Sequence, residues 1–151
     1  MAFTLSSSSF AEGATIPVKH TCDGADRSPP LRWGDSPDAQ SFVLIVGDPD
    51  APGGTFTHWV LYDIPGTQRE LPEGLAPVSA LGTSGTNDFA RMGYGGPCPP
   101  RGGAHRYVFT LAALDRATLA LAPGAAWRAV EDAMRGHVVG QAQLMGRYTR
   151  T

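Results

Sequence analysis

The sequence lacks the features that mark membrane proteins and secreted precursors. Its first ten residues, MAFTLSSSSF, contain neither the charged segment nor the apolar core of a signal peptide. Nowhere do about 18 apolar residues follow one another, as a membrane-spanning helix requires. These absences argue against a transmembrane segment and predict a cytoplasmic protein.

An excess of charge of one sign is missing as well. Twelve Lys and Arg face 14 Asp and Glu, and no basic block could follow a phosphate backbone, so nucleic acid is not expected as a partner. The length of 151 residues, 42% of them hydrophobic, suits one sizeable core and is too short for two ordinary domains. We therefore predict a single domain, 1–151.

Cysteine is scarce. Cys22 and Cys98 stand 76 positions apart, which is neither a CxxC redox pair nor the spacing of a zinc ribbon. From the residues alone, two reduced and partly buried thiols are the ordinary interpretation for a cytosolic chain.

Glycine and proline are abundant, with 19 and 13 residues, and they favour short strands and many turns. We predict a mainly β fold with long strands at 41–48, 57–64 and 105–115, the first buried on both faces. Shorter strands are predicted at 3–7, 15–19, 30–33 and 143–150. One helix is expected at 124–138, directly after Pro123. Residues 65–104 hold nine glycines and six prolines and are interpreted as an ordered, functional loop system.

The stretch DPDAP holds Asp48 and Asp50 in a turn that Pro49 and Pro52 stiffen. Asp-Pro pairs are common turn formers, so this turn alone indicates no function. However, two other predicted strands each deliver a histidine at or near their start, His58 and His105. If the three segments converge, the carboxylates would orient the imidazole rings and favour their charged form.

Other donors would complete such a site. The Tyr107 hydroxyl and the backbone N–H groups of GYGG, residues 93–96, would join the two rings. This donor set suits a phosphate, phosphonate or carboxylate group.

Other kinds of site find weaker support. The strings HxH and HExxH are absent, and His58 and His105 lie 47 positions apart, so no metal ligand set and no cofactor is predicted. The string GTSGT is not a nucleophile elbow, and GYGGPC is not a dinucleotide-binding GxGxxG. His20 and His137 are assigned no role and are expected at the surface or the edge of the core.

Several segments together resemble a known family. DPDAP followed by HW, then GPCPPRGGAHRY, and also IPVKHTCDGADRSPPLRW and GHVVGQAQLMGRY, resemble phosphatidylethanolamine-binding proteins, specifically their bacterial and archaeal Raf-kinase-inhibitor-like branch. The resemblance implies two packed antiparallel-type sheets with Greek-key connections, a short flanking helix and a small anion pocket at one end.

The resemblance also implies the residues of that pocket. They are Asp48, Asp50, His58, His105 and Tyr107, with Gly96 and Pro97 shaping the wall. It implies a cis peptide bond at Ala51–Pro52, two cysteines that are close in space with a disulfide between them possible, and a homodimer.

The leading hypothesis is a non-enzymatic protein that binds a small phosphorylated or otherwise anionic group and modulates a partner protein through it. The alternative is a hydrolase or transferase that acts on a phospho-compound, with His58 or His105 as acid-base. A third hypothesis is an interaction module whose pocket is vestigial.

Overall fold

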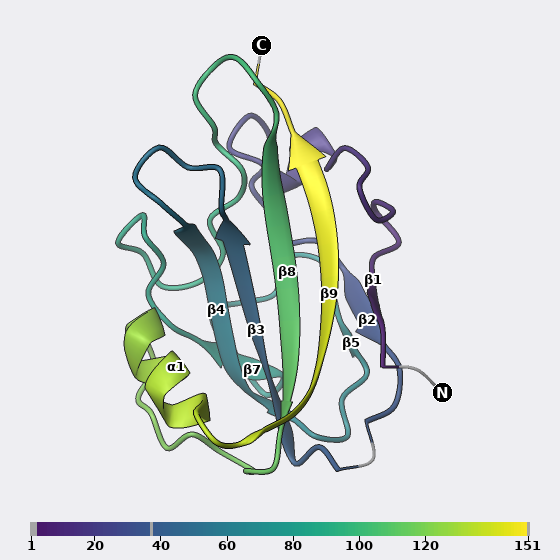
Figure 1. Ribbon diagram of the computed structural model, residues 1–151, viewed down its shortest axis with the longest axis vertical. Helices are drawn as coiled ribbons and strands as arrows, with labels where there is room; N and C mark the ends of the chain where they lie inside the picture. Colours follow the sequence, from purple (N-terminus) through teal and green to yellow (C-terminus); the bar gives the residue numbers. More distant parts are fainter. Residues whose placement is uncertain (1–2, 37, 151) are drawn as a thin grey trace.

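The computed structural model describes residues 3–36 and 38–150, which form two antiparallel sheets and one short α-helix (Figure 1). The smaller sheet has the order β1-β2-β5, with β1 at Leu5–Ser6, β2 at Leu31–Trp33 and β5 at Glu70–Leu71. The larger has the order β6-β7-β4-β3-β8-β9. Its strands are β3 (Ser41–Asp48), β4 (Phe56–Pro65), β6 (Val78–Ser79), β7 (Gly82–Ser84), β8 (His105–Leu114) and β9 (Val138–Tyr148). The mainly β fold with two antiparallel sheets and a short helix is confirmed. The predicted domain, 1–151, includes residues 1–2, 37 and 151, which lie outside the described residues.

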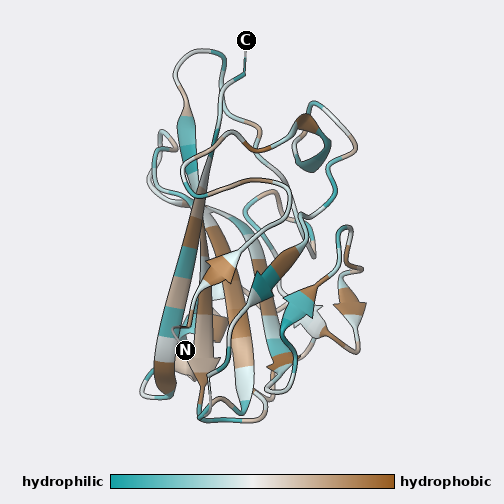
Figure 2. Ribbon diagram, turned by 90° about the vertical axis from the view of Figure 1, so that its right-hand side faces the viewer, coloured by the Kyte–Doolittle hydropathy of each residue, from teal (hydrophilic) through white to brown (hydrophobic). Residues whose placement is uncertain are grey.

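The smaller sheet covers one face of the larger sheet, and the short helix covers part of the other face. Because successive side chains of a strand point to opposite faces, β3 sends Phe42, Leu44 and Val46 into a cluster shared with the smaller sheet. Its Val43 enters a second cluster beneath α1 (Trp127–Met134), with Val130 of the helix. Where the second face is open, as along β9 (Val138–Tyr148), buried and exposed residues alternate, and Figure 2 shows hydrophobic and hydrophilic bands alternating along strands of the sheet. The prediction that 41–48 is a strand buried on both faces is confirmed.

The helix is shorter than the predicted 124–138. Before it, the Gly124 N–H donates to the carbonyl of Ser84, and Ala126 forms a bridge with Thr86, so these residues are tied to the sheet. After it, Gly136 has a φ of 82°, which a helix cannot accommodate. Residues 138–142, which follow this turn, belong to β9, which therefore begins before its predicted start at residue 143.

The strand predicted at 15–19 is wrong. Only Thr15 forms an isolated bridge, with Arg147, and a 3-10 helix then occupies Val18–His20. Pro17 has no N–H to give to a neighbouring strand, so pairing stops where the apolar pattern continues.

Residues 65–104 contribute short strands to both sheets: β5 to the smaller, and β6 and β7 to the larger. Asn87 holds the segment that follows: its buried side chain donates to the Gly93 carbonyl and accepts from the N–H groups of Phe89 and Arg91. The prediction of an ordered loop system is confirmed.

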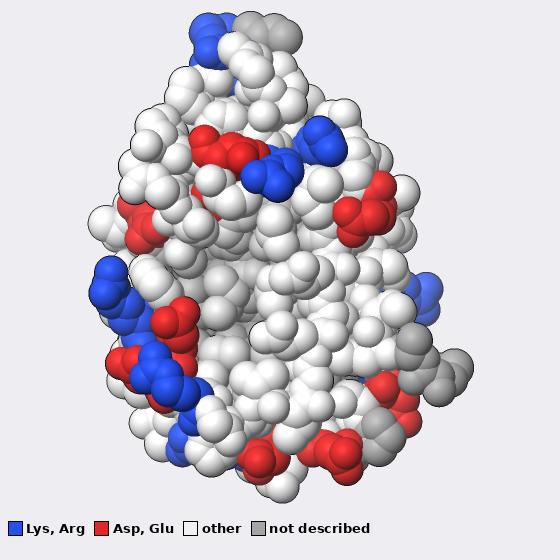
Figure 3. Space-filling view, in the orientation of Figure 1, with Lys and Arg blue, Asp and Glu red and all other residues white. Residues whose placement is uncertain are grey.

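Charged side chains are sparse over the middle of the face seen in Figure 3. Acidic and basic groups both lie toward its margins, where they are mixed. This face therefore carries no single-sign patch of the kind that follows a phosphate backbone.

Candidate functional site

The end of β3 and the starts of β4 and β8 meet at the upper end of the larger sheet in Figure 1. A cavity of about 120 Å³ opens there. It is lined by Asp48, Ala51, Pro52, Phe56, His58, Phe89, Cys98, Pro99, Pro100, His105 and Tyr107. Four of the seven predicted site residues thus line one cavity, whereas Asp50, Gly96 and Pro97 do not.

Asp48 is buried and uses both carboxylate oxygens. One oxygen, Oδ1, accepts the N–H of Asp50 at 2.8 Å, and Oδ2 lies 2.6 Å from Nδ1 of His105. Because a carboxylate accepts, Nδ1 of His105 carries the proton and Nε2 is the ring nitrogen left for a ligand. Asp48 therefore orients the ring of His105, as the sequence predicted.

Asp50 supports the site from outside the cavity. Its carboxylate accepts from the backbone N–H of Arg106 at 2.9 Å and from the guanidinium atoms Nε at 3.0 Å and Nη2 at 2.8 Å. These hydrogen bonds with Arg106 lower the pKa of Asp50 to about 2. Asp50 is not among the residues that line the cavity, and its bonds to Arg106 tie the DPDAP turn to β8. Its part in ligand binding stays a prediction.

His58 sits at an irregularity of β4. The register with β3 shifts between Val46 and Gly47, which leaves His58 as an extra residue. A strictly alternating strand would place His58 on the face of Val60, which packs beneath the helix. The bulge instead brings the ring to the opposite face, where its centroid lies 5.2 Å from that of Tyr107.

The His58 ring is held rigidly. Its Nδ1 donates to the carbonyl oxygen of Gly95 at 2.7 Å. The rings of Phe56 and Phe89 lie around it, with centroids at 5.0 and 5.4 Å. Burial lowers the pKa of His58, an effect that the Gly95 carbonyl and the charge of Asp48 oppose.

Tyr107 presents a buried hydroxyl to the site. Among the described residues this oxygen has no hydrogen-bond partner, and its residue lines the cavity. Burial first, and then the charges of Asp48 and Asp50, raise the pKa of Tyr107. The phenol therefore keeps its proton and can donate it to a ligand in a hydrogen bond.

The GYGG segment does not supply the expected donors. The N–H groups of Gly93, Gly95 and Gly96 donate to the Gly85 carbonyl, the His58 carbonyl and the Asp26 carboxylate. Gly96 is glycine for a steric reason, since a Cβ there would collide with the carbonyl oxygen of His20. This segment holds the His58 ring through the Gly95 carbonyl, and those three N–H groups are not available to an anion.

Three comparisons bear on this geometry. The family model described as phosphatidylethanolamine-binding protein matches residues 6–149.

The chain belongs to the phosphatidylethanolamine-binding protein family.

Relatives of this chain occur in both bacteria and archaea. The chain is 53% identical to a UPF0098 protein of Aquifex aeolicus, over 95% of this chain and 86% of that protein. It is 42% identical to a Mycobacterium tuberculosis protein named as a lipoprotein, LppC, over 96% of this chain and 71% of LppC.

Two crystal structures share the fold of this family member. A phosphatidylethanolamine-binding protein homologue from Chlamydia trachomatis has a TM-score of 0.91 and 37% identity, covering 99% of both chains. Escherichia coli YbcL has a TM-score of 0.90 and 27% identity, covering 100% of both chains.

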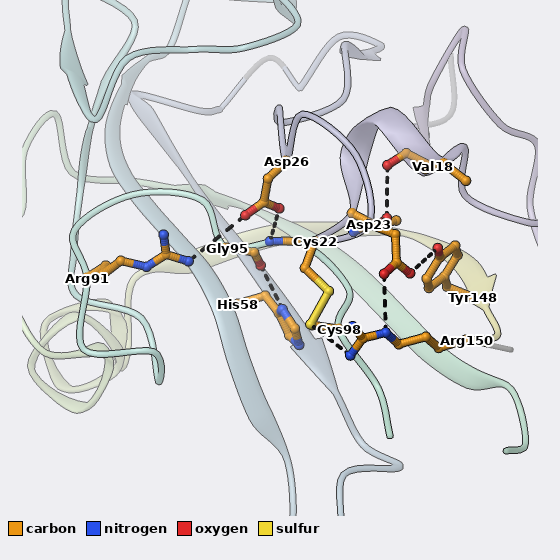
Figure 4. Close-up of a disulfide and its surroundings, with 12 residues drawn as sticks. Val18, Cys22, Asp23, Asp26, His58, Arg91, Gly95, Cys98, Tyr148 and Arg150 are labelled. Carbon is orange, nitrogen blue, oxygen red and sulfur yellow. Dashed lines mark hydrogen bonds and ion pairs between the residues drawn. A yellow bond between two sulfur atoms is a disulfide. The ribbon is translucent and has the colours of Figure 1, made fainter. Parts of the chain in front are cut away.

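A disulfide joins Cys22 to Cys98 in this family member, with the Cα atoms 5.4 Å apart (Figure 4). Nη1 of Arg150 lies 3.7 Å from Sγ of Cys98, and Asp23 accepts from the Tyr148 hydroxyl beside it. The interpretation as two reduced thiols is therefore wrong, and the closeness implied by the family resemblance is confirmed. The bond anchors one wall of the cavity to the loop after the 3-10 helix.

The implied cis bond at Ala51–Pro52 is wrong, because no described peptide bond is cis. The turn reverses instead at Gly54, which has a φ of 107° and donates its N–H to the carbonyl of Ala51. Glycine adopts this φ without steric cost, so the proline can stay trans.

Sequence reasoning missed most of the apolar lining. Phe56, Phe89, Pro99 and Pro100 surround the polar groups of this family's pocket. Phe56 precedes His58 by two residues on one strand, and this spacing could have indicated that the two side chains lie close together. Phe89 comes from a loop without periodicity, and nothing local in the sequence marks it.

The two other histidines are not in the cavity. His20 is fully buried, with Nδ1 at 2.8 Å from the Arg27 carbonyl and Nε2 at 3.0 Å from the Ser9 hydroxyl. It therefore lies deeper than the core edge. His137 follows the helix and pairs with Asp115 at the surface.

Within the described residues, no helix is long and apolar enough to cross a membrane. No three His, Cys, Asp or Glu side chains in that part of the chain form a group that could hold a metal ion.

Proposed function

We propose that this family member is a binding protein whose cavity holds a small oxyanion, such as a phosphoryl or phosphonate group, without chemical conversion. The observation that carries this proposal is the Tyr107 hydroxyl, which is buried, lines the cavity and has no partner among the described residues. Buried polar groups are nearly always hydrogen-bonded, so a lone donor in a cavity points to a ligand that pairs with it.

The surrounding groups suit an oxyanion. Asp48 holds Nδ1 of His105 and leaves Nε2 to the cavity that Tyr107 also lines. When the His105 ring is charged, its Nε2–H can donate to an oxyanion. The family description names a phospholipid, whose phosphoryl group is a diester, so it supports an oxyanion ligand in general and not a monoester in particular.

Binding is favoured over catalysis by the state of the lining groups. Cys98 is the strongest nucleophile among them, and its sulfur is held in the disulfide. The alternative is a hydrolase or transferase of phospho-compounds, in which His58 or His105 would transfer protons. Turnover of phosphomonoesters or phosphodiesters in an activity screen, abolished by replacing either histidine, would establish that alternative.

Calorimetric titration with orthophosphate tests the proposal. In Tyr107→Phe a single oxygen is lost, and the affinity should fall roughly ten-fold or more, as expected for a hydrogen bond of about 1.5 to 3 kcal/mol to a charged group. Thermal stability should not fall, because the removed hydroxyl has no protein partner. His137→Ala is the control and should bind like the parent. If the parent binds no phosphate, the vestigial-pocket hypothesis replaces this one.

Partner, assembly and location belong to the same proposal. An anionic group on a protein or lipid would give a partner a point of attachment, and the homodimer stays a prediction that sedimentation can test.

The predicted cytoplasmic location is also untested. The Cys22–Cys98 disulfide weighs against it, because reducing compartments keep thiols reduced, and so does the naming of LppC as a lipoprotein. Cell fractionation decides between the compartments.

A further inference from the structure

Both cavity histidines leave Nε2 to a ligand, because a protein acceptor holds Nδ1 of each ring. In His58 the Nδ1 proton is committed to the Gly95 carbonyl at 2.7 Å, and Figure 4 shows this ring beside the Cys22–Cys98 disulfide. A neutral imidazole has one N–H and one lone pair, so a neutral His58 presents the lone pair of Nε2. The side-chain hydrogen bond of this ring is made at Nδ1, and the residue lines the cavity, so Nε2 is the nitrogen that a ligand could reach.

The environment of His58 favours the neutral ring. The residue is 4% exposed and lies among the rings of Phe56, Phe89 and Tyr107. Burial in such surroundings disfavours a charged imidazole, and it is the largest cause of the lowered pKa of His58.

The acidic groups near the ring are engaged elsewhere. The titratable or charged groups that face His58 are Asp48 of β3, Asp26 of the loop before β2, and Tyr107 and His105 of β8. Asp48 is bound to His105, and Asp26 accepts from the N–H of Gly96 and lies 4.0 Å from the guanidinium of Arg91. Both carboxylates favour a charged ring, but neither forms a hydrogen bond with it.

We propose that the cavity selects oxyanions that still carry a proton, such as the monoanion of a phosphate monoester, and that Nε2 of His58 accepts a hydrogen bond from the P–OH group. This inference rests on the proposed function. The Tyr107 hydroxyl donates to one ligand oxygen, while the protonated ligand oxygen donates to His58. A sulfate ester or a phosphodiester has the same overall charge but no such proton, and would place an acceptor against an acceptor.

Methyl phosphate and methyl sulfate form a matched pair of probes, because they have nearly the same shape. The second ionisation of a phosphate monoester lies near pH 6, whereas the sulfate ester stays a monoanion throughout. At about pH 6, calorimetry should show methyl phosphate binding roughly ten-fold or more tightly than methyl sulfate, as expected for one buried acceptor left unpaired. Dimethyl phosphate, a diester, should resemble methyl sulfate.

The ratio of the methyl phosphate affinity to the methyl sulfate affinity shows whether the bound phosphate ester carries its proton. Above about pH 6 the ratio should fall by nearly ten-fold per pH unit, as the monoanion becomes scarce. At about pH 8, methyl phosphate should take up close to one proton more per binding event than methyl sulfate, measured in buffers of different ionisation enthalpy.

Replacing His58 should remove the preference for methyl phosphate over methyl sulfate. In His58→Gln the side-chain amide can turn an N–H toward a ligand oxygen, so methyl sulfate should bind more tightly and the ratio should approach one. His137→Gln is the control and should keep the ratio of the parent. If His58→Gln does not fold, the probe pair in the parent still decides the question.

The outcomes separate the two proposals. If neither methyl ester nor orthophosphate binds, the proposed function fails. If both esters bind with a ratio near one, or with a ratio that rises with pH as the dianion forms, the oxyanion site stands and the selection for a protonated ligand is wrong.

Discussion

The larger sheet carries a histidine–aspartate pair at each end, and the two pairs have nearly the same geometry. At the cavity end, Nδ1 of His105 lies 2.6 Å from Asp48; at the opposite end, Nδ1 of His137 lies 2.7 Å from Asp115. The side chains of the first pair are 15% and 5% exposed, and those of the second are 40% and 47% exposed.

The surroundings give the two pairs different roles. Asp48 also caps the DPDAP turn, which Asp50 and Arg106 tie to β8, and His105 lines a cavity with the unpaired hydroxyl of Tyr107. The pair of His137 and Asp115 joins the turn after α1 to the end of β8 and faces solvent, where an ion pair contributes little. A histidine–aspartate motif therefore indicates a site only when burial and an unsatisfied neighbour accompany it.

Replacing the aspartate of each pair should give the largest difference between the two ends of the sheet, in both stability and orthophosphate binding. Asp48→Asn should lower the free energy of unfolding by about 1.5 to 3 kcal/mol, since a buried charged hydrogen bond is lost. The same variant should weaken orthophosphate binding, because His105 loses its orientation. Asp115→Asn should change stability by less than about 1 kcal/mol and leave binding unchanged. Urea denaturation and calorimetry measure both effects, and equal losses in the two variants would contradict the distinction.

Replacing each histidine with asparagine tests the free ring nitrogen. In His105→Asn the amide N–H can still donate to Asp48, but Nε2 is gone, so orthophosphate affinity should fall roughly ten-fold. His137→Asn should bind like the parent in the same titration. Unchanged affinity in His105→Asn would leave the anion to Tyr107 and His58.

Asp50→Asn tests support against simple electrostatics. Removal of a negative charge near an anion would by itself tighten binding. We expect instead a several-fold loss, because the ion pair that holds the DPDAP turn to β8 is broken. Tighter orthophosphate binding in this variant, measured by calorimetry, would show that Asp50 acts only through its charge.

Lowering the pH should remove the contribution of Asp50 to the stability of the folded protein. Its pKa is about 2 in the folded protein, below its ordinary value of 3.8, so the contribution is present above about pH 4 and is lost as the pH falls toward 2. Across this window the parent should lose more stability than Asp50→Asn, and the two urea midpoints should converge. Asp115→Asn is the comparison from the other end of the sheet. A midpoint difference between parent and Asp50→Asn that does not change with pH would contradict the assignment.

Local patterns were enough for the framework of the fold. The run at 41–48 is apolar on both faces because both faces are covered, and β3 has the predicted bounds. Asp48, His58, His105 and Tyr107 could be foreseen because strand ends at one edge of a sheet come together. The orientation of His58 could not, since it depends on a bulge that the partner strand defines. Phe89 and the hydrogen bonds of Gly95 and Gly96 likewise depend on contacts between distant segments.

The disulfide also determines what a single cut in the chain can do. The bond between Cys22 and Cys98 closes a loop of 76 residues that contains every strand from β2 to β7. In the chain-entropy description, such a loop is worth about 4.5 kcal/mol relative to the open unfolded chain. A protease that cleaves one exposed turn inside this loop leaves both fragments covalently joined, with the wall at Cys98 still attached. The oxidised protein can therefore be nicked there and remain one molecule, whereas after reduction only noncovalent packing keeps its fragments together.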